Sequence, residues 1–306
     1  MSGNRNKSNR IKAWDTYLAF GSDGNYALSV TVADYGFYGV VECAVYDFIT
    51  REKHVCTEKP KIIGHKPTLS FMYEKECFDH KSKYCNFHID RDEQSSHIYC
   101  KYDRCFIHTE LEADLHFSRN EDSGVLVGDL FEKNDKYFCR NVKMLSMDVG
   151  GYVRVKGKTY IFDSQRDSGT FDFYRGAFPY KYTDFGGVGS GFVNGKPVGI
   201  AFYNQHGKGL KGELCCDGKC TGLCDVKVEE PARSVMAEWS FTANNRSFDG
   251  EFKPFFNDRA DENNLVFSKH GDRLFGKFNG KATLDDGSEL LVEDITVLCE
   301  KVNIRW

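Results

Sequence analysis

Apolar and polar residues alternate with a period of two along most of the chain. In residues 26–36 (YALSVTVADYG), for example, Leu28, Val30 and Val32 fall on one face, and mostly small or polar residues fall on the other. This alternation is typical of a β-strand that buries one face. No segment has the 3.6-residue periodicity of a long amphipathic helix. The pattern therefore predicts an all-β protein.

Dipeptides that favour tight turns separate these segments at regular intervals. They are Lys156-Gly157, Asn194-Gly195, Asp217-Gly218, Asn244-Asn245 and Asp286-Gly287. Such pairs tolerate the positive φ angles of two-residue hairpins and therefore predict antiparallel neighbours. Strands of ordinary length number about eight to ten before residue 172 and about eight after it, and a small barrel takes about eight. We predict two tandem antiparallel β-barrels, at residues 12–172 and 173–306, after a disordered tail at residues 1–11.

The C-terminal segment predicts how one barrel curves. One face of residues 274–284 alternates large and small apolar residues, beginning with Leu274, Gly276 and Phe278. Glycines on an inward face let a strand coil sharply and leave space inside a small barrel. The last residue, Trp306, is then expected to cap a barrel end.

Composition and charge exclude several classes of function. Hydrophobic residues make up 41% of the 306 residues, which is enough for packed cores, and the net charge of −4 provides no basic surface for nucleic acid. No apolar run approaches the roughly 20 residues needed to cross a bilayer, so we expect no membrane span. Residues 1–10 lack the apolar segment of a secretory signal. We therefore expect a cytoplasmic protein whose twelve cysteines are reduced.

Two blocks of sequence resemble a known family. The C-terminal block contains Phe275-Gly276, Phe278-Asn279-Gly280, Leu284 to Gly287, and then Glu300, Arg305 and Trp306. It is similar to the pattern F-G-x-[FY]-[SN]-G, L-D-D-G and E-x-x-x-x-R-W of the bacterial family called domain of unknown function 2804. Residues 172–180 (DFYRGAFPY) resemble that family's D-x-x-R-G followed by aromatic-Pro-Tyr. The resemblance covers residues 12–306 in scattered blocks.

The family is more distantly similar to proteins with two lipocalin-like (calycin) barrels, which include carotenoid hydratases and pericyclase-type cyclases. The resemblance thus implies two tandem lipocalin-like β-barrels, in agreement with the strand pattern. It does not imply one reaction, because a single fold hosts many functions. A W-x-W motif of the family is absent where this chain has TDFGGVGSG, which keeps a non-catalytic role open.

The second block also carries the main candidates for chemistry. Asp172 is a candidate general acid or base, and Arg175 is a candidate for holding an anionic or carbonyl group. Tyr182 and His206 complete the candidate catalytic set. The structural alternative is an Asp172–Arg175 pair that ties the two barrels together, with His206 in a solvated loop.

Apolar strand faces that point inward suit a hydrophobic ligand. We predict that the protein binds a hydrophobic or amphipathic small molecule, with Tyr180, Phe185 and Phe278 as candidate contacts and without a cofactor. The first alternative is a metal-free hydratase, isomerase or cyclase that acts on such a ligand. The second is a structural or assembly protein whose outer surface binds a protein partner.

One cysteine-rich hairpin resembles a metal site in part. It contains Cys215, Cys216, Cys220 and Cys224. Their spacing differs from the paired C-x₂-C knuckles of zinc ribbons, and adjacent strand residues point to opposite faces. Hairpin packing is therefore the preferred interpretation, while metal ligation and disulfides stay open as alternatives.

A second candidate set consists of Cys77, His80, Cys85 and His88. Two C-x₂-H pairs suggest a metal. However, charged and serine residues surround them, which favours an exposed loop before a strand at residues 97–103. We predict no metal site here.

Overall fold

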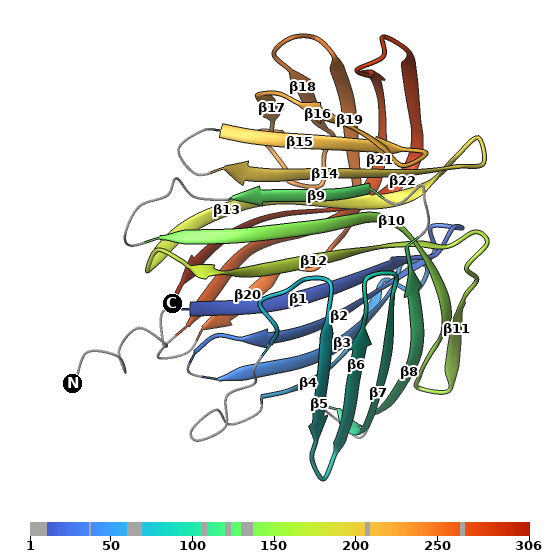
Figure 1. The fold of residues 1–306 in the computed structure, drawn as a ribbon, viewed down its shortest axis with the longest axis vertical. Coiled ribbons are helices and arrows are strands. Elements are labelled where there is room, and N and C mark those ends of the chain that lie inside the picture. The colour runs from blue at the N-terminus through green and yellow to red at the C-terminus, as the bar shows by residue number, and fades with distance from the viewer. Residues whose placement is uncertain are drawn as a thin grey trace.

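The structure is a computed structural model that describes residues 11–36, 38–59, 69–105, 109–119, 124–129, 137–205, 209–263 and 267–306. These residues form two antiparallel sheets (Figure 1) and contain no helix that could cross a membrane. The first sheet contains β1 (Ile11–Phe20), β2 (Tyr26–Asp34), β3 (Gly39–Asp47), β4 (Glu52–Glu58), β5 (Glu76–Lys81), β6 (Cys85–Arg91), β7 (Ser95–Cys105), β8 (Thr109–Ser118), β9 (Gly124–Asp129), β10 (Phe138–Val155), β11 (Lys158–Phe162) and β12 (Ser168–Ala177). The second contains β13 (Lys181–Val193), β14 (Lys196–Gln205), β15 (Gly209–Cys216), β16 (Lys219–Leu223), β17 (Val226–Glu229), β18 (Trp239–Ala243), β19 (Phe248–Asn257), β20 (Ala260–Asn263), β21 (Ser268–Thr283) and β22 (Glu289–Arg305).

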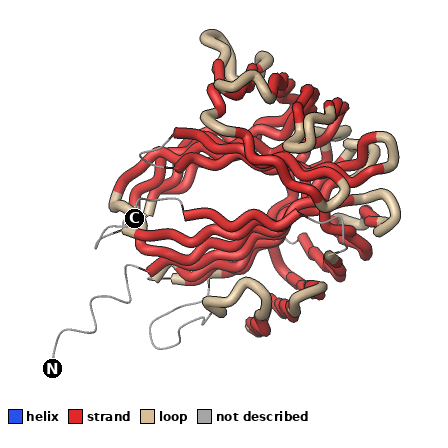
Figure 2. The backbone as a smooth tube through the Cα atoms, turned by 45° about the horizontal axis from the view of Figure 1, so that its top comes forward, coloured by secondary structure: helices blue, strands red, loops and turns tan. Residues whose placement is uncertain are grey.

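The two sheets follow one another along the chain. The first has the strand order β4-β3-β2-β1-β12-β10-β8-β7-β6-β5, and β9 and β11 also pair with β10. The second has the order β16-β15-β14-β13-β22-β21-β19-β18-β17, and β20 also pairs with β21. Both sheets curl, giving one nearly closed barrel and one half-barrel (Figure 2). This confirms the predicted all-β fold of two tandem antiparallel lipocalin-like β-barrels, with additional short strands that branch from long ones.

The chain passes from the first sheet to the second between Ala177 and Lys181. The boundary placed after Asp172 from the sequence lies inside β12, because the aromatic residues that suggested a seam continue the strand. Of the tail predicted at residues 1–11, Ile11 begins β1, and the rest lies outside the described residues.

All five predicted turn dipeptides lie between strands that pair with each other. At three of them both residues have positive φ; Lys156 and Gly157, for example, have φ angles of 51° and 77°. This is the mirror-image turn whose twist matches that of the two flanking strands. The turn chemistry in the sequence therefore sets much of the strand order.

Each sheet buries one face in a core of its own, and a third core fills the space between the sheets. The predicted face of β2, with Val30 and Val32, belongs to the core of the first sheet. The core between the sheets includes Leu18, Tyr46 and Leu145 from the first sheet and Val188, Phe275 and Leu298 from the second. The central strands of both sheets therefore bury side chains on two faces.

The strand β21 shows both faces in use. Its predicted inward face, with Leu274 and Phe278, packs in the core of the second sheet, whereas Phe275 packs between the sheets. A Cβ atom on Gly276 would lie 2.4 Å from the ring of Phe252, so only glycine fits this close approach. The chain then ends in an aromatic cluster, in which Trp306 contacts Trp14, Tyr35, Phe178 and Phe267.

Candidate functional site

Asp172 and Arg175 lie on opposite faces of β12. Residues three apart in a strand point to opposite sides. Arg175 accordingly points into the core of the first sheet, where its side chain is 2% exposed. Asp172 points to the other side, toward Glu300 of the second sheet. The two side chains do not pair, so they do not form the structural brace that was the alternative interpretation, and the structure does not bring them together at one site.

Arg175 belongs to a buried charge network inside the first sheet. Its Nη1 atom donates to Asp15 Oδ1 at 2.6 Å, and Arg91 Nη1 donates to the other oxygen of Asp15 at 2.9 Å. Arg91 also donates to the Tyr17 hydroxyl at 2.8 Å, and Arg175 Nε donates to the backbone carbonyl of Ser70 at 2.8 Å. Because these bonds join strands around the sheet, Arg175 supports the interior and does not face the second sheet.

Asp172 lies in a polar cluster between the sheets. Lys143 on β10 donates from Nζ to Asp172 Oδ2 at 2.8 Å and to the Tyr174 hydroxyl at 3.2 Å. The other carboxylate oxygen, Asp172 Oδ1, is buried and has no hydrogen-bond partner among the residues that the structure describes. Burial raises the pKa of Asp172, although Lys143 opposes the shift. A buried acceptor without a partner costs free energy, so Oδ1 is the atom at which a ligand group would be stabilised.

The second sheet contributes two more acidic residues to this inter-sheet cluster. Burial, together with the charge of Glu300, raises the pKa of Asp184 to about 6, while Lys143 and Lys269 oppose the shift. Burial also acts against the Glu300 carboxylate, but the nearby Arg273 and Lys269 outweigh it and hold the pKa of Glu300 at about 2. Near neutral pH, Asp184 can therefore exchange a proton while Glu300 stays ionised.

The structure places the remaining candidate catalytic residues separately. Tyr182 lies beside the cluster, where burial and then the charge of Asp184 raise its pKa well above its usual value. Its ring stacks on Phe178 with 5.8 Å between the ring centroids. Tyr180, by contrast, is 67% exposed and does not line a site among the described residues. His206 lies outside the described residues.

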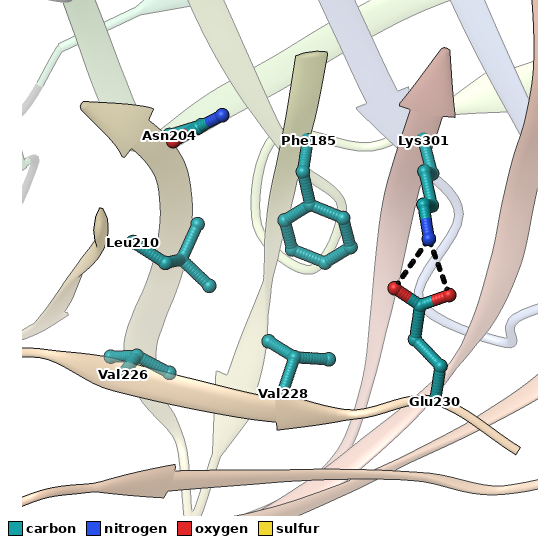
Figure 3. Close-up of a pocket in the computed structure, with 7 residues that line it drawn as sticks. All are labelled: Phe185, Asn204, Leu210, Val226, Val228, Glu230 and Lys301. Atoms are coloured by element: carbon teal, nitrogen blue, oxygen red, sulfur yellow. Dashed lines mark hydrogen bonds and ion pairs between the residues drawn. The ribbon is translucent and has the colours of Figure 1, made fainter. Parts of the chain in front are cut away.

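A pocket of about 220 Å³ lies on the other face of the second sheet, its inner face (Figure 3). Its apolar lining consists of Phe185, Leu210, Val226 and Val228, and its polar lining consists of Asn204, Glu230 and Lys301. Lys301 Nζ forms an ion pair with both carboxylate oxygens of Glu230 at 2.7 Å. The candidate contact Phe185 therefore lines this pocket, while Phe278 is fully buried in the core of the second sheet.

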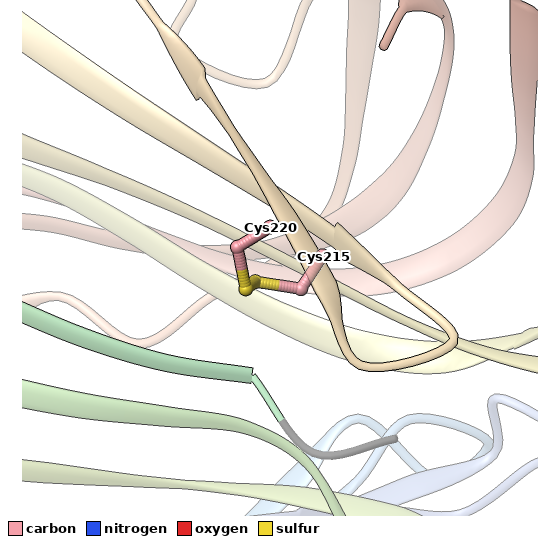
Figure 4. The surroundings of a disulfide bond; sticks show 2 residues. All are labelled: Cys215 and Cys220. Carbon is pink, nitrogen blue, oxygen red and sulfur yellow. A yellow bond between two sulfur atoms is a disulfide. The ribbon is translucent and has the colours of Figure 1, made fainter. Parts of the chain in front are cut away.

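The cysteine hairpin contains a disulfide between Cys215 and Cys220 (Figure 4). The two residues are directly opposite on β15 and β16, and both pack in the core between the sheets. The expectation that all cysteines are reduced was therefore wrong, because cross-strand neighbours lie close enough to bond. Cys216 points into the core of the second sheet and Cys224 is exposed, so the four sulfur atoms do not converge on one ion.

The second set of candidate metal ligands, which consists of Cys77, His80, Cys85 and His88, also divides between the two faces of its strands. Residues 76–91 form β5 and β6 and their turn, not the exposed loop predicted. His80 and Cys85 share one face with Glu58, and His80 Nε2 lies 2.6 Å from Glu58 Oε2. His88 lies on the opposite face, with Nδ1 2.8 Å from Asp79 Oδ1. The C-x₂-H spacing again fails because it places its members on opposite sides of a strand.

A family model matches residues 2–306, and its description is domain of unknown function (DUF2804). The chain belongs to this family. No curated protein sequence matches the DUF2804 chain.

Solved structures resemble the DUF2804 protein in fold. Kievitone hydratase from Nectria haematococca is 9% identical, with a TM-score of 0.60, over 96% of this chain and 88% of that one. An AttH-like protein from Nitrosomonas europaea is 9% identical, with a TM-score of 0.52, over 99% of this chain and 94% of that one. At such low sequence identity, the likeness shows only that the proteins share a fold of two sheets.

Sequence reasoning about the DUF2804 chain missed most of the inter-sheet cluster. Lys143, Asp184 and Glu300 come from three strands that are distant in sequence, and no local motif links them. One signal was available: Lys143 lies within the apolar run of β10, where each neighbour is buried on one face or the other. A charged residue in such a strand needs a partner across an interface.

Proposed function

We propose that this protein binds a small hydrophobic or amphipathic molecule in the pocket of the second sheet. The pocket's mixed lining supports this proposal: four apolar side chains would contact a hydrophobic body, and the Lys301–Glu230 pair would contact a polar end. Its volume of about 220 Å³ is below the roughly 300 Å³ at which drug-sized sites begin. The ligand is therefore a small molecule, or the end of a longer one.

Titration with the fluorescent probe 8-anilinonaphthalene-1-sulfonate tests this proposal, because the probe combines an apolar ring system with an anion. We expect saturable binding by the full chain, weakened at least tenfold in Val228→Phe, which fills the pocket. Leu291→Phe is the matched control, because Leu291 is 52% exposed and lies outside the pocket. The proposal fails if no probe binds, or if Val228→Phe binds as the original chain does.

A second candidate function, an acid–base enzyme of the hydratase, isomerase or cyclase type, is supported by the inter-sheet cluster. Within the described part of the chain, Asp172 Oδ1 has no hydrogen-bond partner, and burial raises the pKa of Asp184 to about 6. In a hydration, Asp184 would donate a proton to an alkene carbon. Asp172 would take a proton from the attacking water, with Lys143 stabilising its charged form.

Incubation in H₂¹⁸O with a panel of alkene-bearing small molecules tests this second function. Mass spectrometry would detect products that have gained one labelled water. We expect Asp172→Asn to abolish turnover, while Asp261→Asn, a change at a 77% exposed carboxylate on β20, leaves it intact. Turnover that survives Asp172→Asn, or its absence across the panel, would count against catalysis and leave the binding proposal untouched.

A further inference from the structure

Histidines occupy the outer face of the first sheet on three adjacent strands. His88 is on β6, His97 is on β7 and His116 is on β8. His97 and His116 are directly opposite in the β7–β8 pairing, and their rings stack with 4.3 Å between centroids and 5° between planes. Directly opposite residues of an antiparallel pair keep their Cβ atoms close, so the two imidazoles are held together by the strands.

Asp114 joins these two histidines on the same face. Its Oδ1 atom lies 2.8 Å from His97 Nε2 and 3.8 Å from His116 Nε2. Asp114 and His116 are two apart on β8, and residues two apart share a face of a strand. Among the ion pairs of the described residues, Asp114 has no lysine or arginine partner.

The sheet fixes the backbone under this group and leaves its outer side open. Ile98 and Leu115, the neighbours that point inward, are fully buried in the core of the first sheet. The side chains of His97, Asp114 and His116 are 39%, 38% and 63% exposed. The backbone is therefore rigid, while the side chains can turn toward one shared point.

We propose that His97, Asp114 and His116 bind one divalent transition-metal ion of the zinc class. Two imidazole nitrogens and a carboxylate oxygen are ordinary zinc ligands at about 2.0–2.2 Å, so neighbouring ligand atoms of a tetrahedral site lie about 3.4 Å apart. The separations of 2.8 and 3.8 Å lie on either side of that value. Three protein ligands and an open fourth position, facing solvent, match the arrangement in which zinc also holds a water molecule.

A second His–Asp pair in the chain provides a control that distinguishes a metal site from a simple ion pair. His270 Nδ1 lies 2.8 Å from Asp261 Oδ1, and both side chains are exposed. Within the described residues, this pair is not part of a group with three convergent ligand atoms, whereas His97, Asp114 and His116 are. Removing His270 is therefore a matched control for removing His97.

Calorimetric titration of the full chain with zinc chloride at pH 7.5 tests the site. We expect one saturable site per chain, weakened roughly tenfold or more in His97→Gln, Asp114→Asn and His116→Gln, and unchanged in His270→Gln. Titration with Co²⁺ adds an absorption spectrum that distinguishes nitrogen and oxygen ligands from thiolate.

Two outcomes would overturn the proposal. One is the absence of saturable binding. The other is binding that survives His97→Gln but disappears in Cys85→Ser, because it would assign the ion to the group formed by Glu58, His80 and Cys85 on the opposite face. Circular dichroism of each variant shows whether the fold is intact, so a loss of affinity can be separated from a loss of structure.

Discussion

Replacing Asp184 with asparagine should change how the stability of the protein depends on pH. In the folded protein, burial and Glu300 raise the pKa of this carboxyl group from 3.8 to about 6. Below about pH 3.8 the group is protonated in both the folded and the unfolded state, so burial carries no charge penalty. As pH rises, the unfolded state loses the proton first, and the folded state becomes less favourable.

The size of the effect follows from the two pKa values. The difference between 3.8 and about 6 corresponds to at most about 3 kcal/mol of unfolding free energy lost between acid and neutral pH. About 2 kcal/mol of this falls between pH 4.5 and pH 7.5. Asparagine does not titrate. The unfolding free energy of Asp184→Asn, relative to that of the original chain, should therefore rise by this amount from pH 4.5 to pH 7.5. Any pH-independent effect of the substitution on stability does not alter this difference.

Urea unfolding, followed by tryptophan fluorescence at both pH values, measures this difference. Taking the difference between variant and original chain at each pH cancels the titration of the groups that do not interact with Asp184. Glu93→Gln, at an exposed turn of the first sheet, is the control for the loss of one carboxylate charge. If the stability difference for Asp184→Asn is the same at both pH values, then Asp184 is not a buried carboxyl group of raised pKa, and the proton-exchange role assigned to it falls.

Three further predictions concern the interfaces and the curved strand. Lys143→Met should lower the unfolding free energy by about 3–5 kcal/mol, because it leaves the Asp172 charge without its partner. The double variant with Asp172→Asn should recover much of this loss in the same urea assay. Gly276→Ala should cost about 1–3 kcal/mol, because the new methyl group would overlap the ring packed against it, whereas Gly222→Ala, which meets only one atom at 4.0 Å, should cost less than 1 kcal/mol. Removing the disulfide with Cys215→Ser should lower the unfolding free energy by about 2 kcal/mol under oxidising conditions. If the original chain has the same melting temperature with and without a reductant, this prediction is contradicted.

The architecture was predictable from the sequence because its determinants are local. The alternation around Val30 and the paired φ requirements of Lys156-Gly157 act over a few residues, and both held in the structure. The candidate site was much less predictable, because Lys143, Asp172 and Glu300 meet only when two sheets pack together. The alternation of side chains between the two faces of a strand was applied to the cysteine hairpin and not to these residues.

That alternation has a simple form. Asp172 and Arg175 are separated by three positions, which in a strand places one side chain inside the sheet and the other outside. Grouping them as one site treated the block as a loop motif. The same error grouped Cys85 with His88. Applying the strand period to the motifs, as well as to the apolar residues, would have separated both pairs.

The double-sided burial of the central strands has a thermodynamic consequence. On β13, Asp184 faces the inter-sheet cluster and its neighbour Phe185 lines the pocket; on β22, Glu300 and Lys301 divide in the same way. Strands β13 and β22 thus lie between the proposed binding pocket on one side and the inter-sheet cluster with Asp184 on the other. If a ligand in the pocket shifts these two strands enough to change the proton affinity of Asp184, then protonation of Asp184 must change the ligand's affinity by the same factor. Measuring probe binding as a function of pH would quantify that linkage.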